Sequence, residues 1–310
     1  MSGLDSPRVA AVVLNWNGTS DTLACVASLA RIDHPNFDII VVDNGSDLSP
    51  ATAIAEQFST VDVVDLPRNL GYAGGNNVGI RRALSREAEF VWVLNNDTVV
   101  DPTVLGELLA AAKRNPRAGV VGAKVLQADD PGRLWVAWGT VTWRQSLIGL
   151  VGEDAADDGT FDIEREVPWV PGCSLLFRRE ALDQVGTFEE GFFAYHEDVD
   201  WAARAKAAGW VSVYCGKARL WHAVHGSSGG SAHYGGFRKY LSARNSILYA
   251  RRHGRFDQRV RLALWILVTL PFVFARRAAS GEAQGVVMKI RGWIDGILGR
   301  PLPLERLGLR

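Results

Sequence analysis

Cysteine is scarce in this chain of 310 residues, which contains three. Cys25, Cys173 and Cys215 show neither CxxC spacing nor the spacing of metal ligands, so a cysteine-bound metal is not expected. The odd number also argues against a framework of disulfides. We therefore expect a protein of the reducing cytosol.

Long apolar runs are also absent, since a bilayer span needs about 20 apolar residues. The longest run, residues 262–275, contains Pro271 and is bracketed by arginines at 259, 261, 276 and 277. This pattern favours a helix in the membrane interface, over about 259–300, with arginines on lipid phosphates. A helix packed on the N-terminal domain or in a dimer contact is the alternative. No basic segment followed by an apolar one starts the chain, so no signal peptide is expected.

The net charge is zero, but the two signs are separated along the chain. Residues 237–310 contain 15 Lys and Arg against four Asp and Glu, a net charge of +11, so the first 236 residues carry −11. A basic tail on an acidic body suggests an anionic surface as a partner. Nucleic acid is not expected, because the basic residues lie in an apolar tail without a stacking platform.

Strands and helices alternate in the first 119 residues. Apolar segments predict strands at 8–15, 38–43, 61–66 and 90–95, with helices at 19–29, 50–58 and through 80–84. This alternation with short loops predicts an α/β fold with a parallel sheet covered by helices on both faces. Afterwards the rhythm changes, with strands predicted at 120–125, 135–143, 167–177, 211–214 and 220–222, helices at 179–185 and 197–208, and helices beyond 237.

Polar clusters follow four of the predicted strands, at 15–17, 43–47, 69–77 and 95–97. The carboxyl ends of parallel strands meet at one edge of a sheet, where ligands bind. Amides, carboxylates and glycines there suit a nucleotide, and Asp97 suits a divalent cation that carries a diphosphate. A plain Asn-Asp turn is the alternative. The glycines at 71, 74 and 75 make neither a P-loop nor a convincing dinucleotide fingerprint.

A second acidic centre contains Glu197, Asp198 and Asp200, at the start of a predicted helix. These carboxylates either complement the helix dipole or do chemistry. Desolvation and mutual repulsion would raise one pKa toward the range of a general base. His222, which follows a strand, is either a buried structural residue or a further metal ligand.

Taken in chain order, these pieces resemble the inverting family 2 glycosyltransferases of GT-A fold, particularly rhamnosyltransferase-like members that build bacterial surface polysaccharides. The matching segments span about residues 10–225 and are VVLNWNG (12–18), VVDNGSD (41–47), NLGYAGGNNVG (69–79), LNNDT (94–98), PGCS (171–174), FAYHEDVDW (193–201) and WH (221–222). The resemblance implies a catalytic domain over 1–236, with a nucleotide-binding part (1–119) and an acceptor part (120–236). A helical C-terminal region, 237–310, follows it.

The resemblance also implies roles at the catalytic and metal positions. The 95–97 segment stands where the family carries its DxD metal motif. Asn95 replaces the first aspartate, so Asp97 would be the main carboxylate ligand of Mg²⁺ or Mn²⁺. Asp198 takes the position of the catalytic base, with Glu197 beside it. His222 is similar to a metal-binding histidine of related galactofuranosyltransferases.

The nucleotide sugar would be held by polar residues and glycines from both parts of the domain. Those expected there are Asn15, Asn17, Asp43, Asn69, Gly71, Asn76, Asn96 and Gly172. Asp43 would read the base, and residues 172–174 would border the donor sugar and acceptor. Trp169, Tyr195 and Trp201 are candidates for stacking on sugars. The glycine- and serine-rich loop 226–236 is expected to close over a ligand, together with His225 and His233.

The expected activity is metal-dependent, inverting transfer of L-rhamnose from dTDP-rhamnose to a glycan or polyprenyl-linked acceptor. The expected place is the cytoplasm, peripherally on the inner face of the cell membrane. A UDP-hexose or UDP-galactofuranose transferase is the alternative of the same fold. A nucleotidyltransferase would need a glycine-rich loop with a basic residue after the first strand, which residues 15–18 do not provide. A non-catalytic membrane scaffold is a third possibility.

Overall fold

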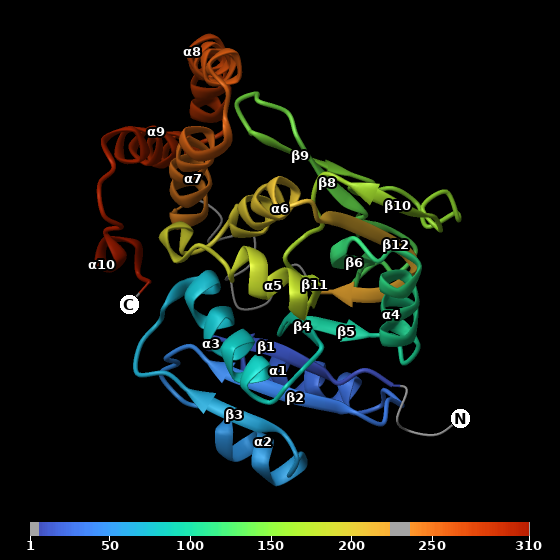
Figure 1. Ribbon diagram of the computed structural model, residues 1–310. Helices are drawn as coiled ribbons and strands as arrows, with labels where there is room; N and C mark the ends of the chain where they lie inside the picture. Colours follow the sequence, from blue (N-terminus) through green and yellow to red (C-terminus); the bar gives the residue numbers. More distant parts are fainter. Residues whose placement is uncertain (1–5, 224–235, 310) are drawn as a thin grey trace.

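The structure is a computed structural model and describes residues 6–223 and 236–309. Its first part alternates strands with helices, as the sequence predicts. In Figure 1 this part occupies the lower half of the molecule. Its elements are β1 (Val9–Asn15), α1 (Thr19–Leu29), β2 (Phe37–Asp43), α2 (Ala51–Gln57), β3 (Asp62–Asp65), α3 (Gly71–Ser85), β4 (Phe90–Asn95), β5 (Thr98–Val100) and α4 (Val104–Arg114).

Strands β4, β1, β2 and β3 lie side by side in that order and run parallel. Their register pairs Asn15 with Asp43, and Asp43 with Asp65, at the carboxyl ends. Asn95 pairs with Leu14 one residue earlier. The polar residues after these strands therefore meet at one edge of the sheet, where ligands bind in α/β proteins.

The second part extends the same sheet with mixed strand directions. Its elements are β6 (Ala118–Gln127), β7 (Leu134–Val136), β8 (Trp138–Val141), β9 (Ile148–Val151), β10 (Glu164–Val167), β11 (Ser174–Arg178), α5 (Arg179–Val185), η1 (Glu190–Phe192), α6 (Glu197–Ala207) and β12 (Val211–His222). β11 runs antiparallel to both β4 and β6, while β12 runs parallel to β6. The parallel order predicted for the first 119 residues thus ends at β4.

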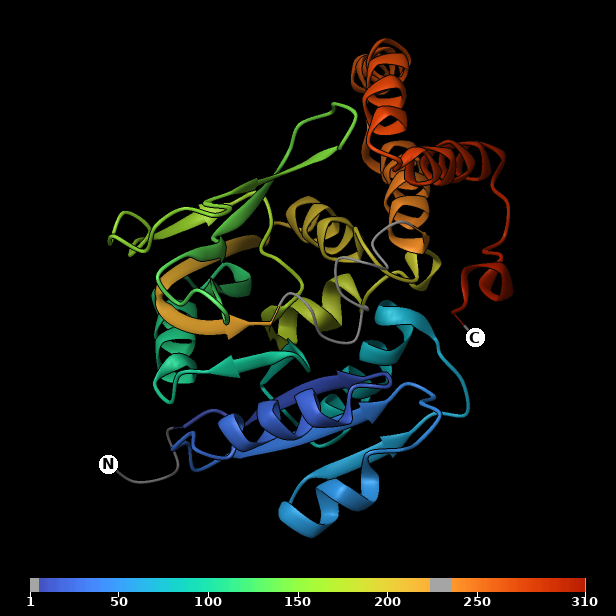
Figure 2. The ribbon, with the colours of Figure 1, turned by 180° about the vertical axis from the view of Figure 1, so that it is seen from behind.

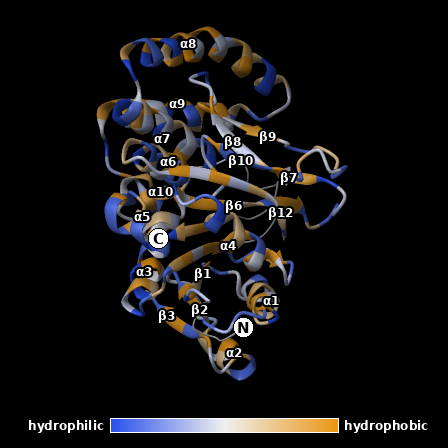
Figure 3. Cartoon of the chain, turned by 45° about the vertical axis from the view of Figure 1, so that its right-hand side comes forward, coloured by the Kyte–Doolittle hydropathy of each residue, from blue (hydrophilic) through white to orange (hydrophobic). Residues whose placement is uncertain are grey.

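Apolar side chains fill both faces of the sheet, because its central strands are buried on both sides. Every residue of β1 is buried, and burying a large apolar side chain contributes about 1.5–3 kcal/mol. Helices α1 and α4 cover one face, and α3, α5 and α6 cover the other. Figure 2 shows α1 in front of the sheet, on the side opposite to α3, and Figure 3 shows the hydrophobic residues of the strands.

Several predictions about local structure differ from the structure. The predicted strand 167–177 is replaced by β10 and β11, and the two strands predicted at 211–214 and 220–222 are the single strand β12. Helix α3 begins at Gly71, so residues 71–77 are helical and not a loop. A Cβ at Gly75 or Gly79 would lie only 2.4 or 2.2 Å from a side-chain atom of β1, so these glycines let the helix lie close to the sheet. The predicted strand 135–143 divides into β7 and β8, and the short strand β5 was not foreseen.

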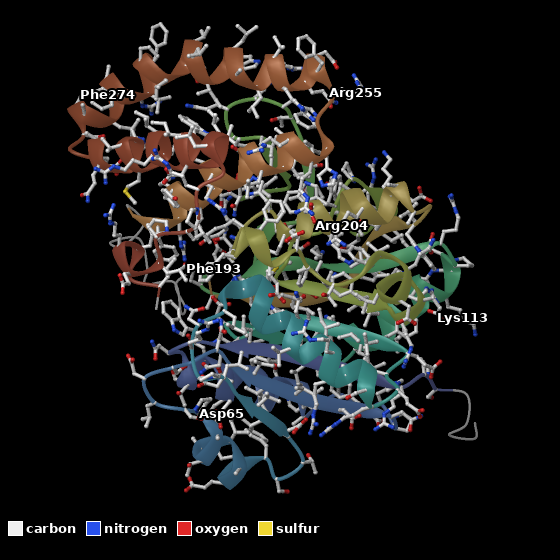
Figure 4. The ribbon with its side chains drawn as sticks, turned by 60° about the vertical axis from the view of Figure 1, so that its left-hand side comes forward. Asp65, Lys113, Phe193, Arg204, Arg255 and Phe274 are labelled. Carbon is white, nitrogen blue, oxygen red and sulfur yellow. The ribbon has the colours of Figure 1, made fainter. Side chains whose placement is uncertain are left out.

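The C-terminal region contains α7 (Phe237–His253), α8 (Phe256–Ala279), α9 (Ala283–Leu298) and α10 (Leu304–Leu307). Tyr249 of α7 and Leu262 of α8 pack in a core cluster with Trp169, Phe192 and Val199. Helix α8 lies along the top of the molecule in Figures 1 and 4, above α7 and α9.

The apolar run 262–275, predicted to be too short for a membrane span, lies inside a longer helix. Helix α8 has 24 residues, because polar residues extend it at both ends of the apolar run. Among the described helices it is the one that is long and apolar enough to cross a membrane, judged by length and composition alone. Only 6% of its most apolar 18-residue stretch is buried in the molecule.

Candidate active site

A cavity of about 500 Å³ lies at the polar edge of the sheet. Its walls come from the strand ends of the first part, from residues 135–198 of the second part and from the start of α7. Among the residues predicted for the site, those that line it are Asn69, Gly71, Asn95, Asn96, Asp97, Trp169, Gly172, Cys173, Tyr195, Glu197, Asp198 and His222. Asp97 and Asp198, which are 101 positions apart, therefore face a common space.

Asp97 and His222 form one side of this cavity. Strand β5 pairs antiparallel with the end of β12 and places His222 opposite Thr98. His222 Nε2 lies 3.0 Å from Asp97 Oδ1 and 3.2 Å from Asn95 Nδ2. The ring of Trp135 packs on the imidazole at a centroid distance of 4.7 Å. A strand that the sequence did not reveal thus positions the histidine beside the aspartate.

This pair of side chains fits a divalent cation. Two ligands bound in adjacent octahedral positions at about 2.1 Å lie about 3 Å apart, which matches the separation of His222 Nε2 and Asp97 Oδ1. Asn95 Oδ1 is buried and has no hydrogen-bond partner among the described residues. Those residues contain no group of three or more His, Cys, Asp and Glu side chains that could hold a metal. A cation here would therefore leave coordination positions for a ligand and water.

Asp198 lies in the first turn of α6 and lines the same cavity. Its Oδ2 accepts a hydrogen bond from the Gly172 N–H at 2.9 Å, and its Oδ1 accepts one from the Val199 N–H at 2.8 Å. Burial raises the pKa of Asp198 to about 6, although these two hydrogen bonds act in the opposite direction. A carboxyl group with this pKa is mostly ionised at pH 7 and can still take up a proton, as a general base must.

Glu197 and His196 precede the half-buried Asp198 and are themselves buried. Burial, together with the charge of Asp198, raises the pKa of Glu197 well above its usual range. Burial lowers the pKa of His196 to about 4. His196 is therefore neutral at pH 7, and the protonated form of Glu197 is favoured more strongly than in water.

Asn15 and Asp43 lie behind the cavity wall and bind each other. Asn15 Nδ2 donates to Asp43 Oδ1 at 2.7 Å, and Ser46 Oγ donates to the same oxygen at 2.5 Å. Asn96 connects to this network through Thr22, whose Oγ1 lies 3.1 Å from Asn96 Nδ2. The described lining of the cavity includes Asn96 but neither Asn15 nor Asp43.

Two further residues predicted for the nucleotide also lie away from the described lining. Asn17 Oδ1 accepts from the Asp47 N–H in an exposed turn. Asn76 is buried within α3 and donates to the Tyr72 carbonyl at 2.9 Å. Asn69, in contrast, lines the cavity and accepts from the Gly71 N–H at the start of α3.

Several other expectations need correction or fall outside the described residues. Trp201 is not available for stacking on a sugar, since it is buried in the core and its Nε1 donates to the Gly186 carbonyl. Ser174 is buried and accepts from Trp92 Nε1, so it does not border the cavity as Gly172 and Cys173 do. Most of loop 226–236, with His225 and His233, lies outside the described residues.

Comparison with known proteins assigns this arrangement to a family. The profile of the family "Glycosyltransferase like family 2" matches residues 7–255, which include every element from β1 to α7. The chain belongs to glycosyltransferase family 2. The resemblance seen in the sequence motifs is thereby confirmed, and the chain is a glycosyltransferase.

Two relatives and one solved structure illustrate how far the similarity extends. The N-acetylglucosaminyl-diphospho-decaprenol L-rhamnosyltransferase of Mycobacterium tuberculosis is 30% identical over 225 residues, which cover 66% of this chain and 72% of that protein. The galactofuranosyltransferase GlfT1 of Mycolicibacterium smegmatis is 28% identical over 193 residues, 60% of each chain. The mannosyltransferase PcManGT of Pyrobaculum calidifontis, solved with GDP-Man and Mn²⁺, has a TM-score of 0.60 and 16% identity, covering 96% of this chain and 89% of its own. The glycosyltransferase therefore has the GT-A fold.

Some residues of the glycosyltransferase cavity were missed by sequence reasoning. Asn44 lines it and donates to Asn69 Oδ1, and Tyr72 lines it and donates to the Gly172 carbonyl at 2.6 Å. Both stand inside the matched motifs, so their polar character was a usable signal. Residues 237–239, 241 and 242 of α7 also line the cavity. They carried no signal, because that segment was assigned to the tail.

Proposed function

We propose that the glycosyltransferase moves L-rhamnose from dTDP-rhamnose to a glycan or polyprenyl-linked acceptor, with inversion at the anomeric carbon. The observation that carries this proposal is the shared cavity, which Asp97, Asp198 and His222 all line. The similarity to a rhamnosyltransferase supports the choice of sugar. A UDP-linked hexose or galactofuranose is the alternative donor, and the similarity to GlfT1 favours it over other choices.

Asp198 acts as the general base in this mechanism. An acceptor hydroxyl attacks the anomeric carbon while the bond to the nucleoside diphosphate breaks, and a carboxylate oxygen of Asp198 takes the hydroxyl proton. The N–H groups of Gly172 and Val199 hold the carboxylate in one orientation, so less reorganisation is needed during the reaction. A divalent cation held by Asp97 and His222 would neutralise charge on the departing diphosphate.

Donor identity can be tested by thermal shift. The purified protein is mixed with dTDP-rhamnose, UDP-galactofuranose, UDP-glucose or GDP-mannose, each with Mg²⁺, Mn²⁺ or EDTA. A ligand that binds only the folded state raises the melting temperature, and we expect the largest rise with dTDP-rhamnose and a cation. A larger rise with a UDP-sugar would select the alternative donor, and no rise with any donor would contradict the proposal.

The glycosyltransferase works on the inner face of the cell membrane in this proposal, with α8 lying on the lipid. Leu267, Val268 and Phe272 of α8 are 67, 61 and 74% exposed, and basic residues stand at both ends of its apolar run. Figure 4 shows side chains of α8 directed away from the body, between the labelled Arg255 and Phe274. An apolar surface bordered by arginines complements acyl chains and anionic headgroups.

Vesicle flotation tests this placement. We expect the wild type to float with vesicles that contain anionic lipid, and to float less in high salt or with neutral lipid. Replacing Leu267 and Phe272 by Ser should reduce flotation strongly. The matched control is Leu48→Ser, which removes an apolar side chain that is 81% exposed in the loop between β2 and α2. Equal flotation of all variants would exclude α8 as the membrane contact.

A further inference from the structure

The segment that leads into the catalytic helix has an unusual backbone. Residues 193–196 connect η1 to α6, line the cavity and stand directly before Glu197 and Asp198. Phe193, Tyr195 and His196 have φ angles of 64, 71 and 74°. Residues other than glycine rarely adopt this left-handed backbone conformation, which persists only where surrounding contacts hold it.

Asn245, a buried residue of α7, supplies such contacts. Its Nδ2 lies 2.9 Å from the carbonyl oxygen of Phe192, and 2.8 Å from the carbonyl oxygens of Ala194 and Tyr195. One side-chain amide therefore binds three carbonyls of the segment. The left-handed residues turn these carbonyls toward a single donor.

Neighbouring residues support the same arrangement from two sides. Arg244 Nη1 donates to the Gly191 carbonyl at 3.0 Å and to Asn245 Oδ1 at 3.1 Å, which orients the amide. From α3, the Ala73 N–H donates to the Phe193 carbonyl at 3.0 Å. The segment is thus held between α3 and α7.

We propose that Asn245 is a positioning residue for glycosyl transfer, which acts by fixing the segment 192–196 and through it the place of Asp198. This inference rests on the proposed role of Asp198 as the base. Asn245 is not among the described residues that line the cavity, so it acts without touching the substrate. It also makes α7 part of the catalytic unit, in keeping with the family profile, which extends to residue 255.

The chemistry of the site explains why asparagine stands there. An asparagine side chain offers two N–H hydrogens and an oxygen that can accept from Arg244. Aspartate has the same shape, but it offers only oxygens and would face three carbonyl oxygens at hydrogen-bond distance. Alanine removes the donors and leaves the three carbonyls without this partner.

The experiment compares Asn245→Ala and Asn245→Asp with the wild type in the full-length protein. The matched control is Ser246→Ala, because Ser246 is the next residue of α7, is equally buried, and bonds only the Ala243 carbonyl of its own helix. Three quantities are measured: hydrogen exchange of the amides 192–198, the affinity and number of binding sites for dTDP-rhamnose with Mn²⁺ by calorimetry, and kcat. The value of kcat is calculated per mole of donor-binding sites found by calorimetry.

We expect both Asn245 variants to exchange the amides 192–198 at least about tenfold faster and to lose on the order of 100-fold in kcat, since a small misplacement of a reacting group has that effect. Their donor affinity should stay within about twofold of the wild type, as should every quantity for Ser246→Ala. A merely structural role would reduce the number of binding sites and leave kcat per site unchanged. That result, or unchanged exchange, would overturn the inference.

Failure of the proposed function would look different. In that case the wild type itself would transfer no sugar, and hydrogen exchange would decide the role of Asn245 on its own. Faster exchange at 192–198 would then support the positioning contact, and unchanged exchange would overturn it.

Discussion

Two groups of side chains on the cavity differ: Asp97 lies 3.0 Å from Nε2 of His222, whereas Glu197 and Asp198 are neighbouring carboxyl groups whose pKa values are raised by burial. In the first arrangement, His222 Nε2 and Asp97 Oδ1 are close enough to bind one cation together. The second removes water from two adjacent carboxyl groups, which favours their protonated forms. The comparison shows how one cavity can give carboxylates different surroundings, which is what the proposed tasks of binding a cation and accepting a proton require.

Asp200 sharpens this comparison, because it is two residues from Asp198 on the same helix. Burial alone would raise the pKa of Asp200, but hydrogen bonds from His253 and Arg204 outweigh that effect and hold the pKa below its usual range. Asp198 receives only backbone N–H groups. Partner groups, and not burial alone, therefore decide which of the two carboxylates can act as a base.

Replacing Asp198 should have the largest effect. We expect Asp198→Asn to lower kcat by roughly 10²–10⁴-fold, the usual contribution of a general base, while donor affinity is retained. Steady-state kinetics and calorimetry with dTDP-rhamnose and Mn²⁺ measure the two quantities. Glu197→Gln serves as the comparison, because burial and the charge of Asp198 raise the pKa of Glu197 and favour its neutral form, so the neutral amide should be tolerated better. A fully active Asp198→Asn variant would remove the assignment of the base.

Replacing the proposed cation ligands, Asp97 and His222, should weaken donor binding. We expect Asp97→Ala to weaken cation-dependent donor binding on the order of 100-fold, since even residues around metal ligands contribute 10- to 100-fold to affinity. His222→Ala should act in the same direction. Calorimetry with Mn²⁺ and with EDTA checks this, and Asn17→Ala in the exposed turn is the control. If Mn²⁺ still strengthens donor binding to Asp97→Ala as in the wild type, the cation lies elsewhere.

The pH dependence of kcat should show the smallest change, and it distinguishes protonation of Asp198 from loss of the cation. Because the pKa of Asp198 is raised to about 6 and the base works ionised, kcat should be near its plateau at pH 7. It should fall about tenfold per pH unit below pH 6. If protons instead competed with the cation for its ligands, the pH at which kcat begins to fall would change with the Mn²⁺ concentration. Rates measured from pH 4.5 to 8 at two Mn²⁺ concentrations distinguish the cases.

The first half of the fold and its polar edge were predictable from local pattern. Strands β1, β2 and β4 are continuous apolar runs, and short helices between them imply parallel neighbours. The places of Asn15, Asp43 and Asn95 at one edge follow from that alone. Their use does not follow, because register pairs Asn15 with Asp43 and joins the two side chains in one hydrogen-bond network behind the cavity.

The second half was less predictable for a physical reason. Strand β5 has three residues, too few for a periodic signal, yet its pairing with β12 brings His222 to Asp97. Helix α7 looked like the start of a basic tail. Its contacts with the segment before Asp198 join residues about 50 positions apart, and no local pattern encodes such a separation.

The sequence by itself determined the strand runs, the order of the family motifs and the residue types needed at a sugar-transfer site, because these depend on periodicity and side-chain chemistry. Tertiary structure decided which carboxylates line the cavity, which histidine lies beside Asp97, and that α7 contacts the segment before Asp198. Those outcomes depend on strand register, on the rotation of helices about their axes and on contacts between residues far apart in the chain. One local sequence pattern is compatible with several registers, several rotations and several distant partners.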